Sequence, residues 1–576
     1  MWSALALPIL MLTLQRSSAG TLYPIAISGQ PAPDGNGVFG GEGTGAGEFD
    51  PPVLNNRGVV CFSVNIRGST GTYAASGVFC GVPGITTQVA RGGQLPGVLA
   101  GGQFRIVDRN SGAINDAGQV AFKSGVTPVM GGNTDAVFRK GSGRDSFSLF
   151  ACGGDPAPGE ENFGSILSSN WIPALSPAGH VAFFADLTGT NGGTADDTGI
   201  FRSNAAGDSV VRIVQEGDPV PGSSGTLTPN GTTPAVNASG EVAFKAGVLG
   251  VSGTSRHAIV RGDGQTRTLI ANFGTAIPGL GTIQDLGGGT VSMNSSGEVA
   301  FYAPTRLSVS PFTPSTAALI GDSEADLEIV AKAGDRLANF PGDLGNVYQH
   351  VMVNDAGQVA YLGSITADSG GALTALFRGK SVVAYDGLAP SGSGVSIIGM
   401  TNREFVINSA GKIAFIAQIS IPGAANGFGI YVWDGAENYD EVTRYGASFL
   451  GSTVTGLNFA GTSGNVLQPG MNGFNDAGEV AFRFELADGR EGIALWSSLP
   501  KPVGGAGTIA PVAGGFRVRF PGISGWDYVM ERDEDLLPPW ERIPTPVKAG
   551  ADGWNTFDDL GPGLPLRRFY RMSEAP

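Results

Sequence analysis

An eight-residue motif with the consensus Asn-x-x-Gly-x-Val-Ala-Phe recurs eight times along the chain, four times with one substitution, and constrains its fold more than any other feature. The copies are spaced by about 60 residues, which is the sequence signature of a repeat architecture. Each copy marks one structural unit, and such units bury their apolar surface against their neighbours. The copies begin at Asn55, Asn115, Ser176, Asn237, Asn294, Asn354, Asn408 and Asn475.

The motif predicts a β-hairpin followed by a strand. The Asn side chain can bond to the backbone two residues on, and Gly adopts the positive φ that a tight reversal needs. Val and Phe of the motif then fall on one face of a strand, because side chains alternate along strands. A second apolar strand follows, such as Gly199-Ile-Phe201, and a third, such as Arg212-Ile-Val-Gln215, leads into a Gly/Pro turn. With the stretch before each Asn, we expect four short strands per unit and an all-β fold.

The Gly/Pro turn also occurs eight times, but its copies are offset from the motif. The first turn, near Gly29, precedes every motif copy, and nothing like it follows Trp496 in the last unit. The last unit therefore lacks its outer strand, while residues 21–28 supply a spare one. A closed ring explains both facts, because closure removes exposed sheet edges. We predict an eight-bladed β-propeller closed by its N-terminal strand; the alternative is an open β-solenoid.

The repeats over about residues 21–499 resemble the bacterial secreted tandem-repeat proteins named for their NxxGxxAF motif, as in Asn115–Phe122 and Asn475–Phe482. Members of that family carry varied C-terminal anchors. The resemblance implies export and display outside the cell or at its surface, and it implies no particular activity or catalytic residues. This chain has neither the terminal hydrophobic helix with a basic tail nor the sortase-type motif of anchored members, so the mode of attachment stays open. We assign residues 20–499 to the propeller.

Residues 1–19 indicate a signal peptide. An apolar run from Leu5 to Leu14 precedes a small-residue stretch in which Ser17-x-Ala19 fits a signal-peptidase site. The run is too short to span a bilayer. Because the segment before it holds no Lys or Arg, a buried first strand is the alternative. The sequence therefore predicts a secreted or surface-located bacterial protein with no transmembrane segment in the mature chain.

A different pattern begins near residue 500. A Pro/Gly-rich linker leads into alternating strands such as Gly515–Phe520 and Trp526–Glu531, which predict a small β-sandwich over residues 500–576. We expect its core to contain Trp526, Trp540, Phe557 and Phe569. The end, Phe569-Tyr-Arg571, resembles C-terminal modules of many secreted bacterial proteins that end in Phe-Tyr-Arg, which implies a role in export or surface retention. The alternative is an accessory domain that binds nothing itself.

Charge and cysteine content limit the partners and the compartment. The chain has 35 basic and 50 acidic residues, a net charge of −15, which argues against nucleic acid or anionic lipid as a partner. Its three cysteines cannot form a disulfide framework, and no Cys-x-x-Cys pair is present for zinc. Cys61 and Cys80 fall on neighbouring predicted strands, so they form either one disulfide in an oxidising compartment or two buried thiols.

The sequence contains no P-loop, no G-x-S-x-G elbow and no H-E-x-x-H motif. We expect the strongest candidate site where each innermost strand begins, because in a propeller these entries surround the mouth of the central channel. Trp171 would stack on a sugar there, and Arg403 and the amides would donate hydrogen bonds. The alternatives are ordinary solvated loops, or catalysis by His350 with Glu404 or Arg403. The predicted ligand-binding residues are Asn110, Asn170, Trp171, Asn230, His350, Asn402, Arg403 and Glu404.

Two other candidates carry less weight. The acidic, glycine-rich loop around Asp196 and Asp197 could hold calcium, but its spacing matches no known calcium loop, and a solvated loop is the alternative. Otherwise we expect no metal and no cofactor. His180 occupies a variable motif position and is expected to be exposed, and His257 lies just before a strand.

The sequence as a whole predicts an exported, non-enzymatic β-propeller that acts as an extracellular or cell-surface binding or display module. Its expected partners are extracellular polysaccharide or envelope proteins. One alternative is a polysaccharide lyase or hydrolase that uses the channel mouth, and another is a structural protein of the cell envelope. Fold alone does not choose among these classes.

Overall fold

The computed structural model describes residues 15–16 and 20–574, apart from short internal segments. These segments are residues 41–47, 100, 108–111, 128–133, 144–145, 160, 167–170, 230–232, 251–255, 288–290, 307–313, 391–392, 401–403, 437, 460–471, 502, 504–506, 514, 534–539, 544–546, 551–552 and 561–568. The described residues form strands and three short 3-10 helices, η1 (Gly97–Leu99), η2 (Gly193–Ala195) and η3 (Glu324–Asp326), and no α-helix. The expected all-β class is confirmed.

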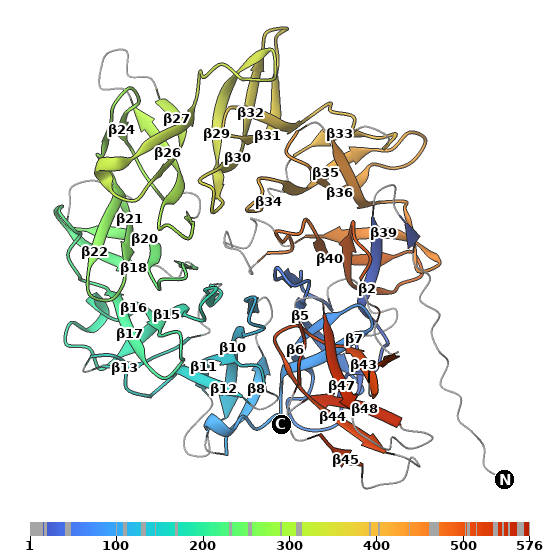
Figure 1. Cartoon of the computed structure of the whole chain (residues 1–576). Helices are drawn as coiled ribbons and strands as arrows, with labels where there is room; N and C mark the ends of the chain where they lie inside the picture. The colour runs from blue at the N-terminus through green and yellow to red at the C-terminus, as the bar shows by residue number, and fades with distance from the viewer. Residues whose placement is uncertain are drawn as a thin grey trace.

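Antiparallel sheets stand around a central axis as in a β-propeller (Figure 1), and the described residues between Thr21 and Ser497 form eight of them. Sheets 1 to 4 are numbered in chain order. Sheet 1 contains β3 (Val38–Phe39), β4 (Val53–Leu54), β5 (Val60–Arg67), β6 (Ser76–Val82) and β7 (Ile85–Arg91). Sheet 2 contains β8 (Gln103–Val107), β9 (Ala113–Ile114), β10 (Val120–Thr127), β11 (Thr134–Lys140) and β12 (Phe147–Cys152). Sheet 3 contains β13 (Asn162–Phe163), β14 (Ala174–Leu175), β15 (Val181–Thr188), β16 (Thr198–Ser203) and β17 (Val210–Gln215). Sheet 4 contains β18 (Thr226–Pro229), β19 (Ala235–Val236), β20 (Val242–Leu249), β21 (His257–Gly262) and β22 (Arg267–Asn272).

Sheets 5 to 8 continue around the ring. Sheet 5 contains β23 (Ala276–Ile277), β24 (Gly281–Ile283), β25 (Ser292–Met293), β26 (Val299–Arg306), β27 (Pro314–Gly321) and β28 (Glu328–Lys332). Sheet 6 contains β29 (Gly342–Val353), β30 (Val359–Ala367), β31 (Ala372–Arg378) and β32 (Ser381–Tyr385). Sheet 7 contains β33 (Ser396–Gly399), β34 (Phe405–Ile407), β35 (Ile413–Ser420), β36 (Gly427–Trp433) and β37 (Tyr439–Arg444). Sheet 8 contains β38 (Ser448–Phe449), β39 (Ser452–Asn458), β40 (Val480–Leu486) and β41 (Glu491–Ser497), joined by β1 (Gln15–Arg16) and β2 (Thr21–Ile27).

The repeated motif forms the hairpin between the innermost strand and the next strand of each sheet. In sheet 1, the Gly58 N–H donates to the Asn55 carbonyl (3.1 Å), and the Val59 N–H donates to Asn55 Oδ1 (2.9 Å). Gly58 has φ 76°, a conformation that favours glycine. Beyond the turn, the motif Phe packs in the core, where Phe62 stacks on Phe79 with ring centroids 6.1 Å apart. The predicted hairpin is confirmed.

The innermost strand is divided in most sheets. In sheet 1, β3 pairs with the far end of β5 (Phe39 with Ile66), whereas β4 pairs with its beginning (Leu54 with Val60). In sheet 6 the two parts form one strand, β29, whose register shifts between Val347 and Val351. The segments expected to enter the innermost strand therefore lie between its two parts, because the strand begins earlier than the sequence indicated.

The N-terminal strand completes the last sheet, as the offset turns predicted. β2 is antiparallel to β41, with Thr21 opposite Ser497 and Ile27 opposite Gly492. The Ser28 N–H continues the ladder by donating to the Glu491 carbonyl (2.8 Å). This pairing joins the two ends of the repeat array, which an open solenoid would leave apart.

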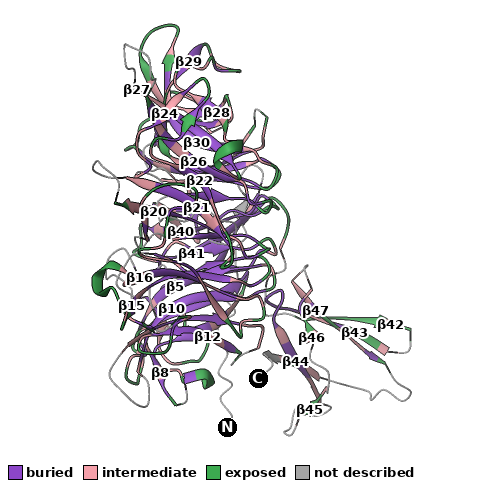
Figure 2. Ribbon diagram, turned by 90° about the vertical axis from the view of Figure 1, so that its left-hand side faces the viewer, coloured by how far each residue is buried: buried purple, intermediate pink, exposed green. Residues whose placement is uncertain are grey.

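The C-terminal residues form two further sheets, which stand beside one face of the ring (Figure 2). One contains β42 (Thr508–Val512), β43 (Gly515–Pro521) and β47 (Trp554–Leu560); the other contains β44 (Asp527–Asp533), β45 (Glu541–Arg542), β46 (Val547–Lys548) and β48 (Phe569–Glu574). Asp559, 2% exposed, links the two sheets by accepting bonds from Arg532 (2.7 Å) and Tyr570 (2.6 Å).

Of the four aromatic residues expected in this C-terminal core, Trp526 packs elsewhere. Its buried ring lies against residues of sheets 1 and 2, so it joins the C-terminal sheets to the propeller. Trp540, Phe557 and Phe569 are only half-buried, and the Arg571 guanidinium lies 4.4 Å from the centre of the Trp540 ring. The expectation for Trp526 is corrected because its partners come from the ring.

The three cysteines divide as one disulfide and one thiol. A disulfide joins Cys61 of β5 to Cys80 of β6, directly opposite each other in sheet 1. Cys152 is free and buried, and burial raises the pKa of its thiol to about 11.

No helix among the described residues is long and apolar enough to cross a membrane.

Candidate functional site: the ring of motif turns

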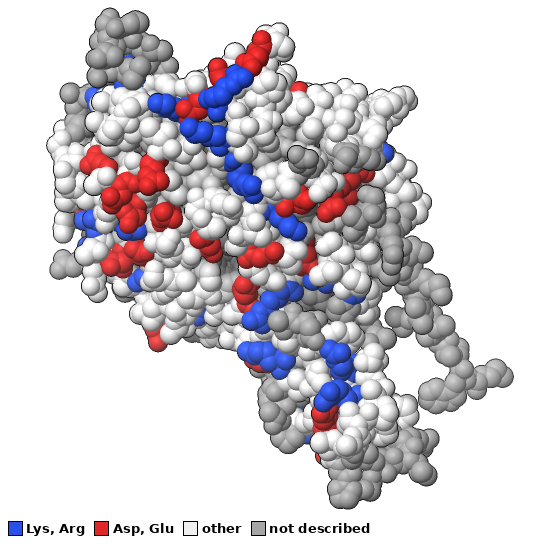
Figure 3. Space-filling view, turned by 45° about the horizontal axis from the view of Figure 1, so that its top comes forward, with Lys and Arg blue, Asp and Glu red and all other residues white. Residues whose placement is uncertain are grey.

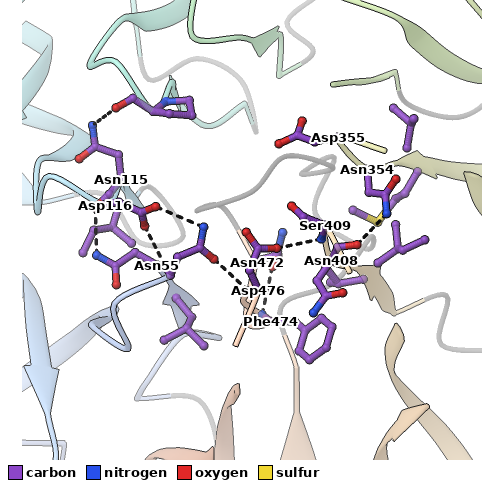
Figure 4. A pocket seen from close by; sticks show the side chains of 18 of the residues that line it. Asn55, Asn115, Asp116, Asn354, Asp355, Asn408, Ser409, Asn472, Phe474 and Asp476 are labelled. Carbon is purple, nitrogen blue, oxygen red and sulfur yellow. Dashed lines mark hydrogen bonds between the residues drawn. The ribbon is translucent and has the colours of Figure 1, made fainter. Parts of the chain in front are cut away.

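The motif turns meet around the central axis and bond to one another from sheet to sheet. Each such bond runs from the Nδ2 of a motif Asn to the backbone carbonyl of the first motif residue in the next sheet (Figure 4). The bond from Asn475 to the Asn55 carbonyl (3.0 Å) connects the last copy to the first. The others are Asn55 to Asn115 (3.0 Å), Asn115 to Ser176 (3.2 Å), Asn294 to Asn354 (3.5 Å), Asn354 to Asn408 (2.8 Å) and Asn408 to Asn475 (3.1 Å). The regular spacing of the motif thus places the same amide at these six junctions between sheets; the third copy has Ser176 in place of the Asn.

The second motif position adds a polar rim to this ring. Asp116 Oδ1 accepts a bond from the Asn56 N–H (2.8 Å), and Asp355 Oδ1 accepts one from the Ser295 N–H (2.8 Å). Asp476 does the same for the Ser409 N–H (2.8 Å). Backbone amides of one sheet therefore hold the carboxylates of the next, and these fixed carboxylates surround the axis.

A pocket lies within this rim (Figure 4). Its polar lining includes the exposed side chains of Asn56, Asp355, Ser409 and Asp476. Its floor includes buried apolar side chains of the innermost strands and Phe474, which directly precedes the last motif copy; those of the strands include Leu54, Ile114, Leu175, Met293, Met352 and Val406. The cavity volume is about 60 Å³, so the pocket admits the end group of a larger ligand rather than a whole small molecule, for which pockets of about 300–1,000 Å³ are typical.

This pocket lies at the hairpin end of the channel, away from the expected site. Of the eight predicted ligand residues, five fall outside the described residues: Asn110, Asn170, Asn230, Asn402 and Arg403. His350 lies in the register shift of β29, and Glu404 directly precedes β34 in the next sheet; both are half-buried. These two residues therefore occupy corresponding interruptions of the innermost strand in neighbouring sheets.

Trp171 does not have the exposed ring that sugar stacking needs. It is 1% exposed and packs in the core between sheets 2 and 3. The Lys123 ammonium lies 4.4 Å from the ring centre. The expectation for this residue is therefore corrected, because β10 of the preceding sheet covers the indole.

The loop considered for calcium uses its carboxylate internally. Asp196 Oδ2 accepts a bond from the Gly192 N–H (2.8 Å). In the described part of the chain, no group of three or more His, Cys, Asp and Glu side chains is arranged to hold a metal ion.

His180, which was expected to be exposed, is half-buried. Its Nδ1 lies 3.0 Å from the Ser203 carbonyl oxygen, and burial lowers the pKa of the imidazole.

A second set of junction residues was missed at the sequence level. In four sheets, the residue opposite the motif Ala is an Arg whose guanidinium donates to the carbonyl of the motif Gly in the next sheet. The pairs are Arg139 with Gly179, Arg202 with Gly240 (2.6 Å), Arg261 with Gly297 (2.5 Å) and Arg378 with Gly411 (2.9 Å). The recurring Arg after the apolar pair of the second strand was the available signal.

Charges of both signs lie close together on the surface. On the face in Figure 3, Lys and Arg form a narrow line with Asp and Glu beside it. One example is Arg336, whose guanidinium contacts both Asp343 (3.2 Å) and Asp368 (2.5 Å). This face offers no broad basic area of the kind that binds a nucleic-acid backbone.

Sequence comparison identifies the family. A family of unknown function, DUF7453, matches residues 11–146 and 132–506, which include all eight motif copies. The chain belongs to the DUF7453 family. The DUF7453 match ends just before β42, so the two C-terminal sheets lie beyond it. No curated protein matches the chain.

Three solved structures similar to this DUF7453 protein have low identity and low structural overlap. The β-propeller domain of the Trilobed protease from Pyrococcus furiosus is 11% identical, with 67% of this chain and 94% of that chain covered and a TM-score of 0.34. The WD40 domain of SCAP from fission yeast is 9% identical, with 84% and 99% covered and a TM-score of 0.34. The Trypanosoma rangeli sialidase is 10% identical, with 85% and 96% covered and a TM-score of 0.27.

Proposed function

We propose that this protein is an exported, non-enzymatic, eight-bladed β-propeller, closed by β2, that binds glycans outside the cell through the ring of motif turns. The observation that carries the proposal is the rim of fixed carboxylates around the apolar floor. Asp355 and Asp476 are exposed, and each uses Oδ1 to accept a backbone amide. Their orientation is therefore set before a ligand arrives, which reduces the entropy cost of binding.

The chemistry of the rim suits a neutral glycan. Carboxylate oxygens accept hydrogen bonds from sugar hydroxyls, and Asn56 and Ser409 add amide and hydroxyl groups that both donate and accept. The apolar floor suits the C–H face of a sugar ring or a hydroxymethyl group. The small cavity favours recognition of a glycan end rather than the middle of a chain.

Export is supported independently of the ligand. Residues 1–19 have the pattern of a signal peptide. The Cys61–Cys80 disulfide suits an oxidising compartment, because cytosolic reductants keep most thiols reduced. The resemblance of the repeats to secreted NxxGxxAF proteins agrees with both.

The mature chain is expected to start at Gly20 or Thr21. Gly20 packs against Trp496 so closely that a Cβ there would lie 2.5 Å from the indole, so this residue is already part of the packed ring. Intact-mass measurement of the secreted protein gives the first residue directly. A mature chain that retains Met1 would contradict export by this signal.

The ring site is tested by calorimetry of the secreted full chain with neutral oligosaccharides of different end groups. We expect one of them to bind, and Asp355→Ala or Asp476→Ala to weaken binding about 10- to 100-fold, the range for losing a hydrogen bond to a charged group. Asp322→Ala is the matched control, because Asp322 is an exposed acidic residue outside the pocket. If all three variants bind as the unmodified chain does, the ring is not the glycan site.

A further inference from the structure

A histidine–aspartate pair lies at the other end of sheets 4 and 5, where β20 connects to β21. His257 Nδ1 is 2.9 Å from Asp285 Oδ1. Because a carboxylate only accepts hydrogen bonds, Nδ1 carries the proton of this bond. The same carboxylate oxygen also accepts the N–H groups of Leu286 (2.7 Å) and Gly287 (2.9 Å), so its position is fixed by the backbone.

The surroundings hold the imidazole in one orientation. Gly287 lies against its Cε1–Nδ1 edge: a Cβ at this glycine would be 2.9 Å from Cε1 and 3.1 Å from Nδ1. Behind it, the buried Lys245 ammonium donates to the Gly287 carbonyl (2.8 Å). With Nδ1 bonded and that edge covered, Nε2 is the ring nitrogen that remains for a ligand.

His257 also lines a pocket that the ring site does not use. The pocket has a volume of about 330 Å³, within the usual range for small-molecule sites. Among the described residues, its lining is formed by Ser223, Ser224, Val248, Arg256, His257, Asn272 and Phe273. The volume and the hydroxyl, amide and cationic groups suit one polar ring-sized ligand.

The cationic side of the pocket is preorganised. The Arg256 guanidinium lies over the Phe273 ring, 3.3 Å from its centre, so the aromatic ring restricts where the cation can lie in the pocket. Elsewhere in the lining, the Asn272 amide donates to Ser223 Oγ (3.0 Å), so the hydroxyl hydrogen of Ser223 can point to a ligand. In a chain of net charge −15, adjacent Arg and His side chains in one pocket are a specific feature rather than a general one.

We propose that this pocket binds the carboxylate-bearing ring of an acidic saccharide. Arg256 binds the carboxylate, and His257 Nε2, Ser223 and Ser224 bind ring hydroxyls. Asp285 keeps His257 oriented, with Nε2 left to accept a hydrogen bond from the ligand. Arginine suits a carboxylate because its planar fork donates two parallel bonds. The proposal does not depend on the ring site, with which it shares no residue.

The test is calorimetry of the secreted full chain with glucuronate, with glucose as the neutral probe and with sodium sulfate as a bare oxyanion. Glucuronate is expected to bind at least 10-fold more tightly than either of the other two. Arg256→Gln and His257→Gln are expected to weaken glucuronate binding at least 10-fold. Arg336→Gln, which removes an equal charge from an exposed site on sheet 6, is the matched control and should leave binding unchanged.

Three results would overturn the proposal. Equal affinity for glucose and glucuronate would mean that the pocket does not recognise the carboxylate of the sugar. Equal affinity for sulfate and glucuronate would mean that the pocket recognises an oxyanion without the sugar. Equal effects of Arg256→Gln and Arg336→Gln would mean that glucuronate binds elsewhere. Melting temperatures of the variants establish that each is folded, and Asp355→Ala should leave glucuronate binding unchanged, so the two sites are tested separately.

Discussion

Deleting Thr21–Ile27 will prevent the chain from reaching its native, closed fold. The strand buries Leu22, Tyr23, Ile25 and Ile27, each at most 5% exposed. At about 1.5–3 kcal/mol per buried large apolar side chain, the loss of these four is on the order of 6–12 kcal/mol. This is comparable with the whole stability of a typical domain, about 5–15 kcal/mol. The exposed edge of β41 would also become available to other chains.

The measurement is thermal unfolding and sedimentation of the deletion variant, and its matched control deletes Thr508–Val512. That segment is also an edge strand, but four of its five residues are exposed, so its loss should cost little. A milder variant, Ile25→Ala, should lower the melting temperature and leave a folded protein, at a cost of about 2–5 kcal/mol. A β2 deletion that melts like the unmodified chain would exclude closure by this strand.

The sequence allowed this closure to be predicted because the relevant signals are local. The turn near Gly29 precedes the first motif, and Trp496 has no turn after it, so the missing and the spare strand could be matched without any knowledge of contacts. The hairpin was predictable for the same reason: Asn55 and Gly58 are three positions apart, and their turn forms within one segment.

The junctions between sheets could not be predicted, because they join residues far apart in sequence. Arg202 and Gly240 lie 38 positions apart, and no local pattern pairs them. Asp355 and Asp476 occupy a motif position that varies among copies, so no pattern in the sequence distinguishes them from other turn residues. The sequence predicts that Trp171 stacks on a sugar, because aromatic rings bind sugars, but an aromatic ring can equally fill a core, and only the burial of Trp171 in the structure distinguishes the two roles.

The second large effect is expected at Trp526, which connects the C-terminal sheets to the propeller. In sheet 1, Cys61 takes the place of the motif Ala and the residue opposite it is Cys80, so no Arg from this position reaches the motif Gly of sheet 2. The Trp526 Nε1–H donates to that Gly118 carbonyl instead (3.0 Å). The C-terminal sheets thereby supply the junction bond that the first repeat lacks.

Trp526→Ala should separate the C-terminal sheets from the ring. The indole is fully buried, and truncating such a side chain costs about 3–5 kcal/mol. The Lys140 ammonium, itself buried, lies 3.9 Å from the ring centre and would lose this contact. Trp526→Phe keeps most of the apolar contact and removes the donor, so it should cost less, about 1–3 kcal/mol for the unsatisfied Gly118 carbonyl.

Hydrogen exchange measured by mass spectrometry distinguishes this docking role from a general loss of stability. In Trp526→Ala, amides of β44 and of the turn at Gly118 should lose protection together, whereas those of sheets 4 to 6 should not change. Trp540→Ala is the control, since Trp540 is half-buried and contacts Arg571 within its own domain. Unchanged exchange at Gly118 in Trp526→Ala would mean that the C-terminal sheets are held by other contacts, such as the Ser142–Asp527 bond (2.8 Å). Loss of protection both in β44 and in the turn at Gly118 would show that the C-terminal sheets and the ring form one structural unit, rather than a ring with a separate module on a linker.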